Sequence, residues 1–325
     1  MRLTRHLLVP VLLLAASPWT ATLAADAGYP VKPIRLVIGS PPGGSTDILA
    51  RVLAQKLTES MGQTVVVDPR AGASGVIAGE IAARANPDGY TLLFPSLQHV
   101  INVGLYSKLS FDPIGDFEPI AQVANVPMFL VTHPSLPVKT VGDLLALARS
   151  KPGALSFSSS GIGTPQHLGM ELLRSGAKLD MVHIPFKGAA DSIAEILAGR
   201  VPVGIITVPP GLPHVKAGKL VAIASAGAAR IPVLPNLPTI AESGLPGFAV
   251  DNWIGMVAPP RTPKAVVNKL HGEIVRIVGT PEIRERMALL GFSPALKSPS
   301  EFLAIMKNDA AKYTQVAKAT GARLD

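Results

Sequence analysis

The amino-acid sequence predicts an α/β protein whose chain folds into two lobes joined by two extended connections. Short apolar runs rich in Val and Ile alternate with amphipathic stretches of helical period, which is typical of mainly parallel sheets covered by helices. Two extended segments, residues 117–131 and residues 234–249 with the strand that follows, cross between the lobes. These crossings predict a first lobe from both chain ends, a second from the middle, and a ligand cleft that closes at the hinge strands.

The strands and helices follow from local patterns. The expected strands are residues 34–38, 64–67, 91–94, 128–132, 155–157, 181–184, 201–207 and 221–224. Helical periodicity predicts helices over residues 46–60 and 189–199. Thr164, Thr262 and Thr280 each precede a Pro and predict helix starts, and residues 298–301 (SPSE) predict a capping box. The last sixty residues look almost wholly helical and are expected to return to cover the first lobe.

The first 24 residues read as an export signal. Arg2 and Arg5 supply its charge, residues 7–16 its apolar run, and residues 22–24 (TLA) a small-residue cleavage site. A membrane anchor is the alternative, but a span needs about 20 apolar residues. The signal predicts a periplasmic protein cleaved near Ala24. The expected division is then 25–125 with 249–325 for the first lobe and 126–248 for the second.

The composition describes a globular protein without a nucleic-acid surface. Apolar residues make up 48% and charged residues 16% of the 325 positions, which leaves ample material for a core. Removal of Arg2 and Arg5 with the signal lowers the formal charge by two, from +8 to +6, a surplus that suits an anionic small ligand. The Lys and Arg residues are scattered, so no nucleic acid is expected as a partner. The absence of cysteine excludes thiol chemistry.

The loop over residues 39–47 (GSPPGGSTD) is the first candidate site. It joins an expected strand to an expected helix, and Gly43 and Gly44 let the backbone approach a ligand closely. Ser45 is the expected N-cap of the helix, whose bare N–H groups and positive end favour an anion. An ordinary connection remains the alternative. The loop lacks the P-loop and dinucleotide patterns, and although Asp68 mimics a ribose-binding acid, a nicotinamide cofactor is not expected in the periplasm.

Two later loops also follow strands and precede helices. Residues 158–167 (SSSGIGTPQH) combine three hydroxyls, two glycines and a Thr-Pro cap, and predict a second anion-receptive helix end. Residues 183–188 (HIPFKG) are the third candidate, in which Lys187 either adds charge to the cleft or is simply solvated. His183 is interpreted as a structural hydrogen-bonding residue.

Catalytic and metal-binding patterns are missing. Ser158, Ser159 and Ser160 do not stand in a G-x-S-x-G motif, and the histidines show no H-E-x-x-H or paired-ligand spacing. No metal site is predicted, and no catalytic residue is proposed.

Seven segments in order resemble one known family. They are residues 29–34 (YPVKPI), 42–47 (PGGSTD), 71–75 (AGASG), 87–93 (PDGYTLL), 159–164 (SSGIGT) with His167, 183–188 (HIPFKG) and 237–247 (LPTIAESGLPG). Together they are similar to the Bug-type solute receptors, the periplasmic substrate-binding proteins of the tripartite tricarboxylate transporter family, over essentially the whole mature chain.

The resemblance implies a periplasmic-binding-protein fold of type II that closes on a small organic carboxylate. It implies no cofactor, a monomer, and as partners either the permease subunits of a tripartite transporter or a sensor. In this family main-chain groups and hydroxyls of the first two loops hold the ligand. Those roles map onto Pro42, Gly43, Gly44, Ser45, Asp47, Ser159, Ser160, Gly161, Gly163, Thr164 and His167. Asp47 is expected to orient its loop, since its charge would repel an anion at contact.

Two departures from the family concern the pocket walls. An aromatic residue is usual where Ser40 stands, so one wall is expected to be more open or more polar. Where many members read Phe-Asp-Asn, this chain has Ile205, Ile206 and Thr207. The missing acid predicts an apolar pocket that disfavours an amino-bearing ligand, with Ser40 and Thr207 among the ligand-binding residues.

The interpretation that follows is an extracytoplasmic carboxylate receptor of a tripartite transporter, and not an enzyme. An exported hydrolase using Ser159 or Ser160 is the alternative from another class. A sensory carboxylate receptor without a transport role is the third.

Overall fold

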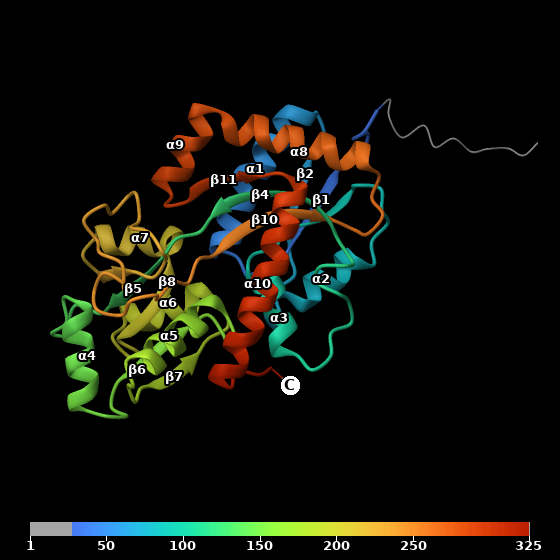
Figure 1. The fold of residues 1–325 in the computed structure, drawn as a ribbon. Coiled ribbons are helices and arrows are strands. Elements are labelled where there is room, and N and C mark those ends of the chain that lie inside the picture. The colour runs from blue at the N-terminus through green and yellow to red at the C-terminus, as the bar shows by residue number, and fades with distance from the viewer. Residues whose placement is uncertain (1–27, 325) are drawn as a thin grey trace, which may run out of the picture.

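The computed structural model describes residues 28–324, which build two separate sheets flanked by helices (Figure 1). The expected export signal therefore lies outside the described residues. The first sheet has the order β11-β4-β10-β3-β1-β2 and the second the order β7-β6-β8-β5-β9. The strands of the first sheet are β1 (Ile34–Ile38), β2 (Val65–Pro69), β3 (Thr91–Leu93), β4 (Glu118–Asn125), β10 (Trp253–Ala258) and β11 (Ser293–Lys297). Those of the second are β5 (Met128–Thr132), β6 (Ser156–Ser159), β7 (Val182–Pro185), β8 (Val203–Thr207) and β9 (Val221–Ser225).

Both sheets are mixed, so the expectation of mainly parallel sheets is wrong. β1 runs parallel to β2 and β3, and β6 runs parallel to β7 and β8. β4, β5, β9, β10 and β11 join them by antiparallel pairing. Two neighbouring strands can run parallel only if a long connection, usually a helix, returns the chain to the same end of the sheet. The strand–helix units around β1 and β6 provide such connections. The α/β fold class itself, with two lobes, is confirmed.

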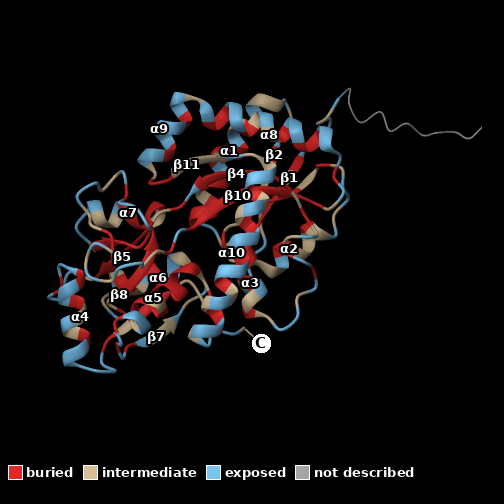
Figure 2. Ribbon diagram, in the orientation of Figure 1, coloured by how far each residue is buried: buried red, intermediate tan, exposed pale blue. Residues whose placement is uncertain are grey.

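Helices cover both sheets, and Figure 2 shows their inner faces and the central strands buried, whereas the edge strands β2, β7 and β11 are mostly intermediate or exposed. In the first lobe they are α1 (Ser45–Met61), the short η1 (Ala73–Gly75) leading into α2 (Val76–Ala83), α3 (Gln98–Leu105), α8 (Lys264–Gly279), α9 (Pro281–Leu289) and α10 (Pro299–Thr320). In the second they are α4 (Val141–Ser150), α5 (Pro165–Gly176), α6 (Ala189–Leu197) and α7 (Val208–Lys216). The helices expected over residues 46–60 and 189–199 are thus confirmed as α1 and α6.

Most predicted helix starts are confirmed. Thr164 and Thr280 accept a hydrogen bond from the first turn of α5 and α9, and Ser298 forms the capping box of α10. Thr262 is not a cap, because α8 begins at Lys264 with Pro263 as N-cap, and the Thr262 hydroxyl donates to the Pro259 carbonyl instead.

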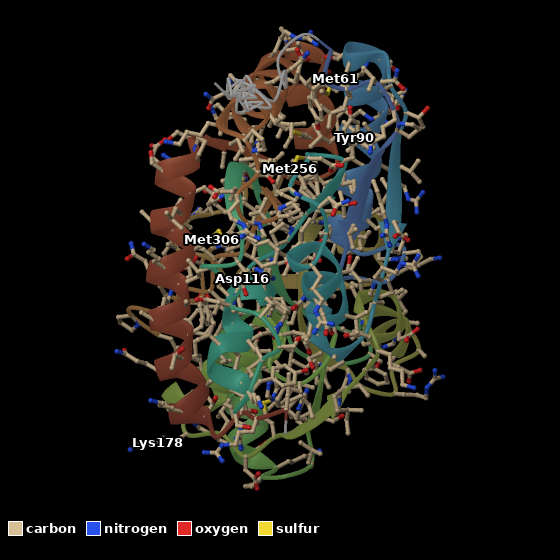
Figure 3. All side chains as sticks on the ribbon, turned by 90° about the vertical axis from the view of Figure 1, so that its right-hand side faces the viewer. Met61, Tyr90, Asp116, Lys178, Met256 and Met306 are labelled. Atoms are coloured by element: carbon tan, nitrogen blue, oxygen red, sulfur yellow. The ribbon has the colours of Figure 1, made fainter. Side chains whose placement is uncertain are left out.

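The C-terminal segment returns to the first lobe but is not wholly helical. α8 packs on α1 and β4, and α10 packs on α3 and β4 and also contacts α5 of the second lobe. β11 interrupts the helices and adds an edge strand beside β4. Met306 lies on the inner side of α10 (Figure 3) and is fully buried, and the buried Phe302 ring stands edge-on to Trp253 at 5.0 Å.

The two connections between the lobes run side by side. β4 leads directly into β5, and the long segment after β9 returns through residues 226–252 to β10. The Val126 amide donates to the Asn252 carbonyl at 2.7 Å, which ties one connection to the other. The exact division at residues 125/126 and 248/249 stays a prediction.

The packing of β10 against α10 yields a stability prediction. A Cβ on Gly255 would lie 2.2 Å from Phe302 Cζ and 2.8 Å from the Ala121 carbonyl oxygen, so Gly255→Ala should destabilise the protein by about 1–3 kcal/mol. Gly272 lies exposed within α8 with open space around it, so Gly272→Ala should stabilise the protein by about 0.5–1 kcal/mol. Urea unfolding of both variants measures the difference, and equal midpoints would contradict the packing described.

Candidate functional site

A cavity of about 600 Å³ lies between the lobes and is lined by six turns that each lead from a strand into a helix. The β1–α1, β2–α2 and β3–α3 turns come from the first lobe, and the β6–α5, β7–α6 and β8–α7 turns from the second. The carboxyl ends of β1, β2 and β3 in one sheet and of β6, β7 and β8 in the other therefore open onto the same space. Ligands of open α/β sheets bind at such strand ends, which makes this cavity the candidate site.

The predicted site residues fall into two groups around this cavity. Those that line it are Ser40, Gly44, Ser45, Ser160, Gly161, Thr164 and Thr207. Those of the same turns that do not line it are Pro42, Gly43, Asp47, Ser159, Gly163 and His167. The structure thus brings the first two predicted loops to one place, and contact of each residue with a ligand stays a prediction.

The β1–α1 turn differs from expectation at its cap. Gly44 is the N-cap of α1, and Ser45 is the first helical residue, so Ser45 does not cap the helix. Its hydroxyl instead donates across the lobes to Thr207 Oγ1 at 2.8 Å, and both residues are buried. The first-turn amides of α1 consequently have no side-chain acceptor, which leaves them available to a ligand.

Asp47 holds the turn in place, as expected. Its Oδ2 accepts a hydrogen bond from the Gly43 amide at 3.0 Å, and its Oδ1 lies 2.8 Å from Nη2 of Arg51. The Gly43 amide is therefore occupied within the loop. Arg51 balances the carboxylate charge close to the helix end, so the positive potential at the start of α1 is preserved.

The β6–α5 turn satisfies most of its own amides. The Gly161 amide donates to Ser159 Oγ, the Gly163 amide to Nδ1 of His167, and the Thr164 amide to the Gly161 carbonyl. Thr164 Oγ1 also caps α5 by accepting from the His167 amide at 3.3 Å. Glycine and serine in this turn thus build a braced loop, which the sequence alone could not distinguish from a loop with free donors.

A stack of imidazoles supports that brace. Nε2 of His183 lies 2.7 Å from Ser159 Oγ, and the His183 ring stacks on His167 at a centroid distance of 4.0 Å. The interpretation of His183 as a structural hydrogen-bonding residue is confirmed. Burial lowers the pKa of both imidazoles to about 4, so His183 is a weak base near neutral pH. Ser159 is also fully buried, which disfavours the hydrolase alternative at this residue.

The β7–α6 turn contributes more than the sequence indicated. Gly188 is the N-cap of α6 without a side-chain hydrogen bond, so the first-turn amides of α6 resemble those of α1. A Cβ on Gly188, whose φ is +136°, would lie 2.6 Å from Cγ of Pro41 in the opposite lobe. Lys187 lines the cavity next to this contact and is exposed. The sequence feature that could have indicated this site is the one used for the first loop, a glycine between an expected strand and an expected helix.

Helix capping follows the position of the cavity. Helices α1, α2, α3, α6 and α7 begin at the cavity and have no side-chain cap, with α5 as the exception. Away from it, α4, α9 and α10 are capped by Thr140, Thr280 and Ser298, while α8 is not. The α7 start offers few donors because Pro209 and Pro210 follow Val208. The first-turn N–H groups of α1 and α6 therefore lie at the cavity without a side-chain acceptor, and such helix ends favour an anion.

Two polar side chains that the sequence reasoning missed, Gln98 and Asn252, also line the cavity beside the predicted Ser40. Asn102 Nδ2 donates to the Ser74 carbonyl and its Oδ1 accepts from Gln98 Nε2, which leaves Gln98 Oε1 without a partner among the described residues. Ser40 Oγ and Asn252 Oδ1 are likewise buried and unpaired there. Unpaired buried polar atoms are costly, so these three mark places for a ligand group or water. Only their tertiary setting reveals this, because Gln98 and Asn252 belong to no recognisable motif.

The described chain shows neither a metal cluster nor a membrane-spanning helix. Within residues 28–324, His, Asp and Glu side chains do not gather in groups of three or more that could hold a metal ion. None of the helices in that range has the length and apolar character needed to cross a membrane.

Comparison with known proteins gives one consistent family. The model of the tripartite tricarboxylate transporter family receptor matches residues 49–322. Protein BugT of Bordetella pertussis is 35% identical over 328 residues, which cover 100% of both chains. Two solved structures are similar along most of their length. Rpa4515 of R. palustris with adipate has a TM-score of 0.88 and 34% identity, covering 91% of this chain and 99% of its own. MatC of Rhodopseudomonas palustris with bound malate has a TM-score of 0.82 and 29% identity, covering 89% and 99%.

The hydrogen bond between the lobes can be measured by a double-mutant cycle. Ser45→Ala leaves the Thr207 hydroxyl without its buried partner, and Thr207→Val leaves the Ser45 hydroxyl without its partner. Each variant should destabilise the protein by about 1–3 kcal/mol. The double variant should lose less than the sum, since neither orphaned hydroxyl remains. Strict additivity of the free energies of unfolding would show that the two hydroxyls do not interact.

The buried His99 predicts a pH dependence of stability. Burial lowers its pKa to about 4, while the unfolded imidazole keeps a value near 6.5. Between pH 6.5 and pH 4 the imidazole is protonated in the unfolded chain but neutral in the folded one. The free energy of unfolding therefore falls by up to about 1.4 kcal/mol for each unit by which the pH is lowered. Its Nε2 lies 2.8 Å from the Pro113 carbonyl, and His99→Gln can retain that donor. Denaturant titrations from pH 4 to 8 should show a shallower slope for this variant, and an unchanged slope would contradict the assignment.

Proposed function

Since this chain belongs to the tripartite tricarboxylate transporter receptor family, we propose that it captures a small organic carboxylate between its two lobes in the periplasm. The observation that supports this most directly is electrostatic. The α1 and α6 helices start at the cavity without side-chain caps, and no Asp or Glu of the described chain lines it. An anion satisfies such an end, and a cation does not. The adipate and malate named with Rpa4515 and MatC are both carboxylates, which supports the same ligand class.

Main-chain donors can supply the affinity. The first three amides of a helix lack intrahelical acceptors, and Ser45, Thr46 and Ala189 from the two starts line the cavity. Hydrogen bonds to a charged group contribute about 1.5–3 kcal/mol each, and micromolar binding needs only about 8 kcal/mol. A few bonds from each lobe, less the costs of association, reach that range.

Closure of the lobes would then retain the ligand. Residues 25–125 with 249–325 form one body and residues 126–248 the other in this proposal, with the paired connections at Val126 and Asn252 as the hinge. The Ser45–Thr207 hydrogen bond and the Gly188–Pro41 contact join the lobes beside the cavity. A ligand that bonds both α1 and α6 binds this joined arrangement more tightly than a separated one, so it favours closure.

The wider setting follows from the same proposal. The chain is exported, its signal is cleaved near Ala24, and the mature monomer delivers its ligand to the permease subunits of a tripartite transporter. The apolar Ile205 and Ile206 precede Thr207 at the place where the family resemblance predicts an acid, and no Asp or Glu of the described chain lines the cavity. An ammonium group would therefore find no counter-charge, so a carboxylate without an amino group is preferred.

A thermal-shift screen tests this function. Mono-, di- and tricarboxylates and aromatic acids should include one that stabilises the protein, by about 2.7 kcal/mol at 100 times its dissociation constant. Ala189→Pro removes one amide at the start of α6, where proline fits the first helical position and the preceding Gly188, with ψ of 175°, lies outside the helical region that proline disfavours. This variant should bind about 10- to 100-fold more weakly, the loss of one charge-assisted bond.

The matched control places the same change at a helix away from the cavity. Lys264→Pro alters the first residue of α8, which does not line the site, and should leave the affinity unchanged. If no carboxylate shifts the melting temperature of the wild-type protein, the proposed function is wrong.

A further inference from the structure

The cavity carries a single formal charge among the described residues that line it. Lys187 is that charge, since Asp, Glu and Arg are missing from the lining and burial keeps His99 neutral near pH 7 by lowering its pKa to about 4. Lys187 makes no hydrogen bond or ion pair with another described residue. Asp191, four residues later in the first turn of α6, does not line the cavity. Lys187 is thus an uncompensated cation in a lining without a protein anion.

Its position within the cavity is specific. Lys187 is exposed, whereas Ser45, Thr46 and Thr207 in the same lining are buried. The next residue, Gly188, touches Pro41 of the β1–α1 turn, so Lys187 lies at the rim where the two lobes meet. A ligand that extends outward from the buried turns meets neutral donors first and the ammonium group at its outer end.

We propose that Lys187 is a specificity-determining residue, which selects ligands that carry a second carboxylate at the end that faces the rim. This inference rests on the proposed function, because the first carboxylate is the one held by the buried turns. A monocarboxylate of equal length gains nothing from Lys187, since its outer end is a methyl group. Lys187 therefore changes the ratio of the dicarboxylate affinity to the monocarboxylate affinity, whereas the other polar lining groups change both affinities.

Calorimetry with chain-length-matched pairs tests this role. The probes are adipate against hexanoate and succinate against butyrate, extended to the C5, C7 and C8 pairs. Loss of one charge-assisted hydrogen bond predicts that Lys187→Gln binds the preferred dicarboxylate about 10- to 100-fold more weakly, and the matched monocarboxylate within about 2-fold of wild type. Lys187→Arg should retain much of the preference. Because Lys187 is exposed, the preference should also shrink as salt rises.

A second lysine variant separates this role from net charge. Lys219 is exposed and lies outside the cavity, so Lys219→Gln should keep the wild-type ratio at every chain length. An unchanged ratio in Lys187→Gln overturns the specificity role while the carboxylate receptor stands. If neither member of any pair binds the wild-type protein, the proposed function and the role of Lys187 fail together, and a variant that weakens both members equally shows a general effect instead.

Discussion

The hydrogen bond from Ser45 to Thr207 joins the start of α1 to the end of β8, and the geometry of the cavity depends on it. It exists because Gly44, and not Ser45, caps α1. A serine at the N-cap would direct its hydroxyl to the amides of its own first turn. One residue later, the same hydroxyl reaches the other lobe and those amides remain unbonded. The helix gives up a local cap, and the protein gains a contact between lobes together with an anion-receptive helix end.

The charged residues near the start of α1 also keep this helix end receptive to an anion. An acid in the first helical turn ordinarily stabilises the helix by facing its positive end. Asp47 occupies such a position in α1, but its two oxygens bond the Gly43 amide and Arg51. The carboxylate thereby fixes the loop while the guanidinium compensates its charge. The potential of the helix end is directed into the cavity, where Lys187 adds the sole formal charge of the described lining.

The sequence carried the strand–turn–helix pattern because that pattern is local. The runs that became β1, β6 and β8 and the helices α1 and α6 could be read from periodicity and turn residues. Features that depend on distant contacts could not. β11 has little apolar character and contains Pro294, and it becomes a strand only because it can pair at the edge beside β4. Similarly, the β1–α1 and β6–α5 turns are both rich in glycine and serine, but only the partners of Gly161 and Gly163 show that the second turn bonds its amides internally.

The lobes meet through glycines, which explains why their approach is well defined. Gly163 faces Leu105, Gly188 faces Pro41 and Gly291 faces Val208, and a Cβ at each would lie 2.2, 2.6 and 2.5 Å from the opposing side chain. Gly163, Gly188 and Pro41 belong to strand–helix turns that line the cavity. Leu105 ends α3, and Gly291 lies between α9 and β11 opposite Val208 at the start of α7. On the glycine side of each contact there is only backbone, so only the opposing side chain can adjust to a closer or a tilted approach. Close-packed contacts of this kind do not deform continuously, and they favour one joined arrangement of the lobes over a range of partly closed ones. The space left for a ligand is therefore set by the backbone of six turns, and selection among ligands falls to the few side chains that reach into it.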